Sequence, residues 1–134
     1  GALGDIFYVM GPKEIGLAMR TTVHYSKKLT DEELNDIEAE LEDVITDHVN
    51  SLDIGEAFYL NKLVANLFSV DESIANLGVT GKPIEEIYVY KESRLEDNRV
   101  RQKLLGDYIP ESDERVIIEP SVSNPIVFDR KFVA

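Results

Sequence analysis

The chain has 134 residues, the usual size of one domain, and its 26 acidic residues against 14 basic ones give a formal net charge of −12. The absence of cysteine excludes disulfides and thiolate metal sites, and the acidic balance argues against nucleic-acid binding through a basic face. No apolar run is long enough to cross a bilayer, and no N-terminal stretch combines a basic with an apolar region. We therefore expect neither a membrane span nor a signal peptide.

The beginning of the chain predicts two neighbouring strands. Residues 6–10 (IFYVM) are rich in β-formers, and residues 17–25 (LAMRTTVHY) alternate between a mostly apolar and a mostly polar set. Alternation with a period of two is typical of a strand that buries one face. The connection at Gly11 and Pro12 lets the two strands pair.

A long amphipathic helix is predicted over residues 31–52. Thr30 and Glu33 match a capping box, in which each side chain bonds the backbone N–H of the other residue. Apolar residues then recur at helical spacing, and they form one stripe: Leu34, Ile37, Leu41, Val44, Ile45, His48, Val49 and Leu52. Gly55 lies just beyond this pattern, where a helix stop is expected.

The segment after this helix predicts a structural joint. Its residues are Ile54, Gly55, Phe58 and Tyr59. Gly55 is expected to end the first helix, and Phe58 and Tyr59 to redirect the chain into a second helix of about ten residues. That helix carries Leu60, Leu63, Val64 and Leu67 at helical spacing.

The remainder of the chain predicts strands at residues 74–79, 87–90 and 115–119. The interval 91–113 is charged and poorly periodic, which predicts a long surface loop with at most a helical turn near residues 100–105. Residues 120–134 contain Pro, Ser and Asn and are predicted to be a tail. The order of elements favours a single α+β domain, with two helices packed on one face of a small, mostly antiparallel or mixed sheet.

Charge and tyrosine are both unevenly distributed. Residues 29–61 hold eleven acids and no Lys or Arg, whereas residues 91–103 hold five bases. Such a polar surface steers self-association or docking, or is simply two solvated faces. Tyr88 and Tyr90 alternate with Ile87 and Val89 along their strand. If Ile87 and Val89 face the helices, the tyrosines line the uncovered side of the sheet, either as an interface or as filling within the monomer. The candidate interface comprises Tyr88, Tyr90, Arg94, Arg99 and Arg101.

No catalytic constellation is evident in the sequence. His24 lies on the polar side of its strand, and His48 continues the apolar stripe, where we expect a hydrogen-bonded imidazole at the edge of the core. The acids Asp31, Glu38, Glu42 and Asp43 are expected on the solvent face of the helix. We therefore assign no catalytic, metal-binding or cofactor-binding residue.

The chain resembles the C-terminal part of phage baseplate J-like proteins, which are wedge components of contractile tails. The resemblance rests on LTDEELNDIEAELEDVITDHVNSLDIGEAFYLNKLVANLFSVDESIANLGV (residues 29–79) and on DIFYVMGPKEIGLAMRTTVHY (residues 5–25). The shared pattern is a strand, an acidic helix with a Thr/Asp cap, a Gly-containing joint, a second helix and another strand. The chain departs from it at Asp71-Glu72-Ser73, where family members often have a Gly-Val turn, and little matches beyond Ile84.

The resemblance implies a structural role in the virion, within a tail baseplate assembled in the host cytoplasm. It implies that the chain is the C-terminal fragment of a longer protein, that its partners are other wedge or hub proteins, and that it is not an enzyme. We also expect a homodimer or higher self-association. The alternatives are the equivalent part of a bacterial contractile injection apparatus, and a small acidic domain that binds a cation or another ligand.

Overall fold

A single long strand, β1 (Lys13–Tyr25), organises the sheet. In the computed structural model, which describes residues 11–92 and 99–133, β1 pairs along one edge with β3 (Glu86–Glu92) and β2 (Ile74–Leu77), both antiparallel. Along its other edge it pairs in parallel with β5 (Glu114–Ile118) and β6 (Ile126–Phe132). β4 (Arg99–Lys103) extends the sheet beyond β3.

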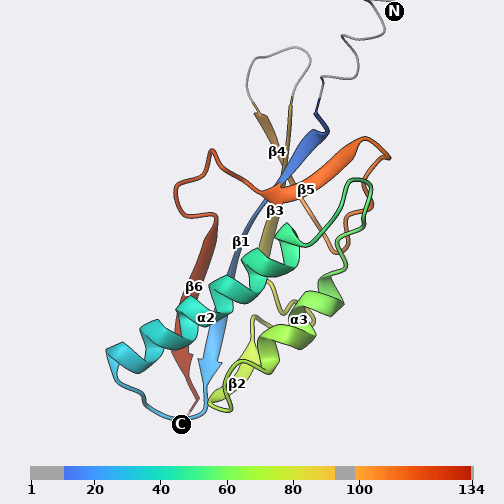
Figure 1. Ribbon diagram of the computed structural model, residues 1–134. Helices are drawn as coiled ribbons and strands as arrows, with labels where there is room; N and C mark the ends of the chain where they lie inside the picture. The colour runs from blue at the N-terminus through green and yellow to red at the C-terminus, as the bar shows by residue number, and fades with distance from the viewer. Residues whose placement is uncertain (1–10, 93–98, 134) are drawn as a thin grey trace, which may run out of the picture.

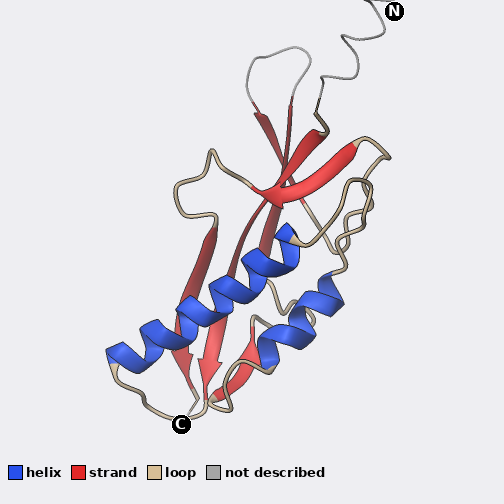
Figure 2. Ribbon diagram, viewed as in Figure 1, coloured by secondary structure: helices blue, strands red, loops and turns tan. Residues whose placement is uncertain are grey.

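Two helices, α2 (Asp31–Asn50) and α3 (Leu60–Phe68), cover the same face of this six-stranded sheet (Figures 1 and 2). The predicted α+β architecture is therefore confirmed, and the sheet is mixed because β5 and β6 run parallel to β1. The opposite face carries no helix among the described residues.

The alternation predicted for β1 is confirmed, and the strand begins four residues earlier than expected, at Lys13. The side chains that face the helices are at most 4% exposed, and they belong to Leu17, Met19, Thr21, Val23 and Tyr25. Arg20, between them, is exposed on the other face. The expected strand at residues 6–10, and its pairing with β1, lie outside the described residues.

The capping box at the start of α2 is confirmed. The Glu33 N–H donates to the Thr30 hydroxyl, and the Thr30 N–H donates to the Glu33 carboxylate, each over 3.1 Å. Most of the apolar stripe is buried, and only Val44 and His48 are half-buried between Leu34 and Val49. However, α2 ends at Asn50 with Ser51 as its C-cap, so the expectation that Gly55 ends this helix is wrong. Gly55 instead forms a separate turn with a φ of 78°.

The predictions for residues 91–113 and 120–134 are wrong in part, because each interval contains a strand. β4 lies where a loop or a helical turn was expected, and β6 lies in the expected tail. The segment RVRQK of β4 has one apolar residue and no alternation, so its strand depends on pairing with β3. β6 pairs with β1 across more than a hundred residues of chain, a contact that no local pattern announces.

Candidate interaction surface

The uncovered face of the sheet brings tyrosines and bases together. Ile87 and Val89 of β3 are 3% exposed beneath the helices, so Tyr88 and Tyr90 point to the other face, where both are half-buried. There Tyr88 is paired with Lys103 of β4, and Tyr90 with Arg101. We call Tyr88, Tyr90, Arg101 and Lys103 the aromatic–basic surface. The orientation predicted for the two tyrosines is confirmed.

Arg101 stacks on this surface rather than joining an ion pair. Its guanidinium carbon lies 4.4 Å from the centre of the Tyr88 ring, which is the geometry of a cation–π contact. None of the ion pairs among the described residues involves Arg101 or Lys103. Within residues 11–92 and 99–133, these two positive charges therefore have no acidic partner.

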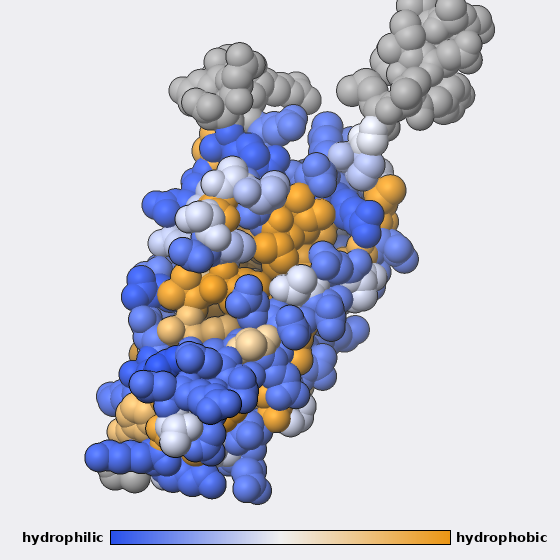
Figure 3. Space-filling model, turned by 60° about the vertical axis from the view of Figure 1, so that its left-hand side comes forward, coloured by the Kyte–Doolittle hydropathy of each residue, from blue (hydrophilic) through white to orange (hydrophobic). Residues whose placement is uncertain are grey.

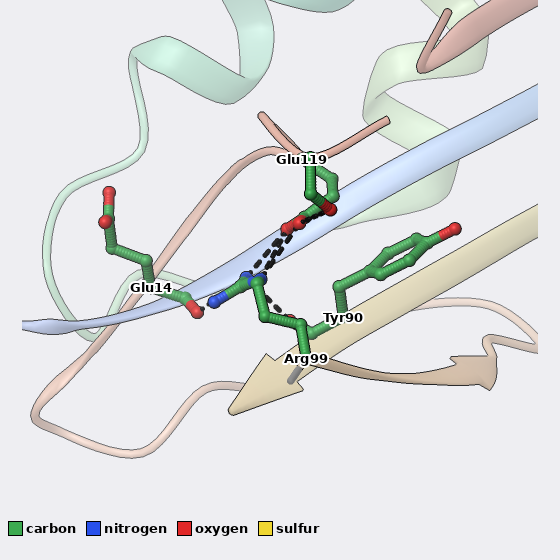
Figure 4. Close-up of polar contacts among 5 residues, drawn as sticks. Glu14, Tyr90, Arg99 and Glu119 are labelled. Carbon is green, nitrogen blue, oxygen red and sulfur yellow. Dashed lines mark hydrogen bonds and ion pairs between the residues drawn. The ribbon is translucent and has the colours of Figure 1, made fainter. Parts of the chain in front are cut away.

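Arg99, the next predicted interface residue, serves a different purpose (Figure 4). Its Nε lies 2.8 and 2.9 Å from the two carboxylate oxygens of Glu119, and its Nη2 lies 2.7 Å from the first of them. Nη2 also donates to the backbone carbonyls of Glu14 and Tyr90, at 3.1 and 3.0 Å. Arg99 thus holds β3, β4 and β1 to the chain that follows β5. Arg94, the remaining predicted residue, lies outside the described residues.

Glu119 is a key residue that sequence reasoning missed. Its side chain is fully buried. It comes directly after the apolar strand β5, and no pattern in the neighbouring sequence predicts that a glutamate there is buried. The space for it comes from Gly16 of β1, where a Cβ atom would overlap the Glu119 carboxylate. The Ser121 hydroxyl also donates to this carboxylate. A glycine between the apolar residues Ile15 and Leu17 was the available signal, and it becomes meaningful only once β5 is placed beside it.

The predicted joint is anchored to residues 107–114. The Gly55 N–H donates to the Glu114 carbonyl at 2.7 Å, and Phe58 exchanges two backbone hydrogen bonds with Tyr108, at 2.9 and 3.0 Å. Phe58 is fully buried, whereas Ile54 and Tyr59 are 54% and 43% exposed.

The same segment supplies the cap of α3, because Asp107 Oδ1 accepts from the Leu60 N–H at 2.8 Å. The N-cap residue itself, Tyr59, makes no side-chain cap bond. The Asp107 carboxylate gives the Leu60 N–H, which has no partner within the helix, a hydrogen-bond acceptor, and its negative charge suits the positive end of the helix dipole. The joint is therefore a point where three parts of the fold meet: α2, α3 and residues 107–114, the last of which begins β5.

The two histidines occupy different surroundings. His24 Nε2 lies 2.6 Å from the Gly78 carbonyl. His48 packs edge-on against Phe58 with ring centres 6.0 Å apart, and its buried Nε2 has no hydrogen-bond partner within the described chain. The expected hydrogen-bonded imidazole is thus wrong for His48. Burial lowers the pKa of His48; the negative charge of Glu56 opposes this decrease, and Lys62 adds a lesser decrease.

One acid expected on the solvent face of α2 is instead part of a bonded network. Glu38 accepts hydrogen bonds from the Tyr25 hydroxyl at 2.9 Å and from Arg130 Nε at 2.7 Å. These contacts tie α2 to β1 and β6. The pKa of Tyr25 is raised, mainly by burial and then by its bond to Glu38. The prediction that Glu38 is merely solvated is therefore wrong, whereas Asp31, Glu42 and Asp43 are exposed.

The side of the molecule that carries β6 is partly apolar (Figure 3). Figure 3 turns the β6 side of the molecule forward and shows an apolar area near its middle, with hydrophilic residues above and below. An open groove lies between α2 and β6, lined by Asn35, Glu38, Ala39, Glu42, Asn124, Ile126, Val127 and Phe128. Nothing in the described chain indicates a ligand for this groove.

Comparison with known proteins adds no relative. The chain matches no protein-family model, no curated protein and no solved structure. Neither helix of the described chain is long and apolar enough to cross a membrane. Within residues 11–92 and 99–133, no group of three or more His, Asp or Glu side chains is placed to hold a metal ion.

Proposed function

We propose that this domain is a structural protein-interaction domain of a contractile-tail baseplate wedge, without a catalytic role. It mediates assembly of subunits around the tail hub of a virion. The observation that carries the proposal is the uncovered sheet face with its aromatic–basic surface. Tyr and Arg are enriched in protein interfaces, because each offers a large contact area together with a polar end.

The order of elements gives further support. The pattern behind the baseplate resemblance is a strand, a capped acidic helix, a Gly joint, a second helix and a strand. The described chain has β1, the capped α2, the turn at Gly55, α3 and β2 in that order. An equivalent place in a bacterial contractile injection apparatus uses the same chemistry and is the variant within this class.

The class of assembly is tested by location. Antibodies raised against the domain should label one end of purified contractile particles from the source of the sequence, and the gene should lie beside tail-sheath or other baseplate genes. Complete contractile particles that do not contain the protein would overturn the proposal. Labelling of a bacterial injection apparatus instead of a phage tail would select the variant.

The cation-binding alternative has its own test. Calcium that bound only the folded domain would raise its melting temperature by mass action. We expect no change in melting temperature at millimolar calcium, because the acids of α2 project along the helix rather than around a common centre. A rise of several degrees would favour this alternative over the structural role.

A further inference from the structure

We propose that the aromatic–basic surface binds the acidic outer face of α2 on a second copy of the chain, so that copies associate head to tail. This inference rests on the proposed structural role and names a partner for the same surface. It is argued from charge, exposure and the placement of the two surfaces on the fold.

The acidic half of the contact is a stripe along α2, which we call the acidic stripe. It consists of Glu32, Asp36, Glu40, Asp43 and Asp47, all of them exposed. Because these residues recur at helical spacing, they lie on one line opposite the buried apolar stripe, over roughly 22 Å at 1.5 Å per residue. None of the ion pairs among the described residues involves them. The stripe is therefore a row of negative charge with no counter-charge from its own described chain.

The basic half is smaller and more rigid. β4 contains no acid, and its side chains Arg101 and Lys103 project beside Tyr88 and Tyr90. The Arg99–Glu119 pair fixes β4 to the body of the domain, and the stack on Tyr88 fixes the Arg101 guanidinium. A partner therefore meets positive groups and aromatic rings that are already ordered, which lowers the entropy cost of binding. The tyrosine rings add apolar area to the charge contact.

The helices cover one side of the sheet (Figure 1). The aromatic–basic surface lies on the other side, because Tyr88 and Tyr90 alternate with the buried Ile87 and Val89, so the two surfaces face opposite ways. One copy cannot bring its own stripe onto its own basic surface, but a second copy can supply it. A symmetric contact of two basic surfaces would place Arg101 and Lys103 near their own copies, and like charges repel. A head-to-tail contact pairs opposite charges and can repeat, so it closes into a ring or extends as a chain.

Sedimentation velocity over a range of protein concentrations tests the contact with two charge-reversed variants. One carries Arg101→Glu and Lys103→Glu, and the other carries Asp43→Lys and Asp47→Lys. The wild type should associate with increasing concentration, and each variant alone should associate at least tenfold more weakly. An equimolar mixture of the two variants should associate again, because each then offers the other a surface of opposite charge.

Matched controls carry the same change of net charge elsewhere on the exposed surface. Lys28→Glu with Lys131→Glu, and Asp53→Lys with Glu111→Lys, should associate as the wild type does, because all four residues are exposed and lie outside both surfaces. Circular dichroism melting shows whether each variant folds. The α2 substitutions are on a solvated helix face, so they keep the test decisive even if the β4 substitutions unfold the hairpin.

Three results would overturn the inference: a wild type that stays monomeric at high concentration, an α2 variant that associates normally, or a mixture of two folded variants that fails to associate. Normal association of the α2 variants together with weak association of the β4 variants would indicate a symmetric contact through the sheet. That result removes the head-to-tail contact but leaves the structural role intact. Labelling of contractile particles tests the role itself, so the two can fail separately.

Discussion

The guanidinium of Arg99 forms an ion pair with the carboxylate of Glu119, and the Glu119 side chain is fully buried. The Arg99 side chain remains 21% exposed, so the pair links the outer hairpin to the interior of the sheet. A buried carboxylate is costly unless it is paired and hydrogen-bonded, and here Arg99 and Ser121 supply the partners. The position of β4, and with it the aromatic–basic surface, therefore depends on this pair.

Removal of the guanidinium should destabilise the domain strongly. Arg99→Met leaves the Glu119 carboxylate buried without its countercharge, and the expected loss is about 3 kcal/mol in the free energy of unfolding. Urea unfolding at neutral pH measures it. The double variant Arg99→Met with Glu119→Gln should recover part of the loss, because a neutral amide does not need a countercharge. Equal stability of the single and the double variant would contradict a charge-dependent role for the pair.

Gly16 should tolerate no side chain. A Cβ atom at this position would overlap the Glu119 carboxylate. The backbone of Gly16 cannot shift to relieve the overlap, because β1 is paired there with β3 on one side and β5 on the other. Gly16→Ala should cost about 1–3 kcal/mol of unfolding free energy, as overpacking of a filled interior does. Gly106→Ala is the matched control, since a Cβ atom at Gly106 meets nothing within 4 Å. Thermal melting that ranks the two variants equally would show that Glu119 can move aside.

Gly55→Val should destabilise the joint through backbone strain. The φ of Gly55 is 78°, and a side chain with a branched Cβ is strained in that region by about 1–2 kcal/mol. Space does not explain the effect, because the closest atoms to an added Cβ lie 3.7 Å away, in ordinary contact. The melting temperature should therefore fall for Gly55→Ala as well as for Gly55→Val. An unchanged melting temperature in both variants would refute the argument.

His48 should make the domain less stable in mild acid. Burial lowers the pKa of His48 in the folded state, so the unfolded chain, with a value near 6.5, binds the proton more tightly. The stability that the neutral imidazole contributes is present above pH 6.5 and is lost as the pH falls toward the folded pKa. The fall in unfolding free energy from pH 7.5 to pH 5.5 should be smaller in His48→Leu than in the wild type. Equal falls in both proteins would mean that His48 does not titrate differently on folding.

The elements that were predictable from the sequence are those stabilised by contacts close along the chain. Thr30 and Glu33 cap α2 from within one turn, and the alternation from Leu17 to Tyr25 already shows which side of β1 is buried. The same alternation predicted that Tyr88 and Tyr90 point to the uncovered face. Periodicity carries this information because side-chain direction follows directly from helix or strand geometry.

Contacts between distant segments were decided by tertiary structure alone. β6 is a strand because β1 offers it a free edge, and α3 begins at Leu60 with a cap from Asp107. Glu119 is buried because a glycine on another strand leaves the space and an arginine on a third supplies the charge. Each such contact closes a long loop of chain, and its free energy depends on which residue lies at the distant position in the sequence. A local pattern carries no record of that partner, which is why the charged segment around Arg99 looked like a loop and folds as part of the sheet.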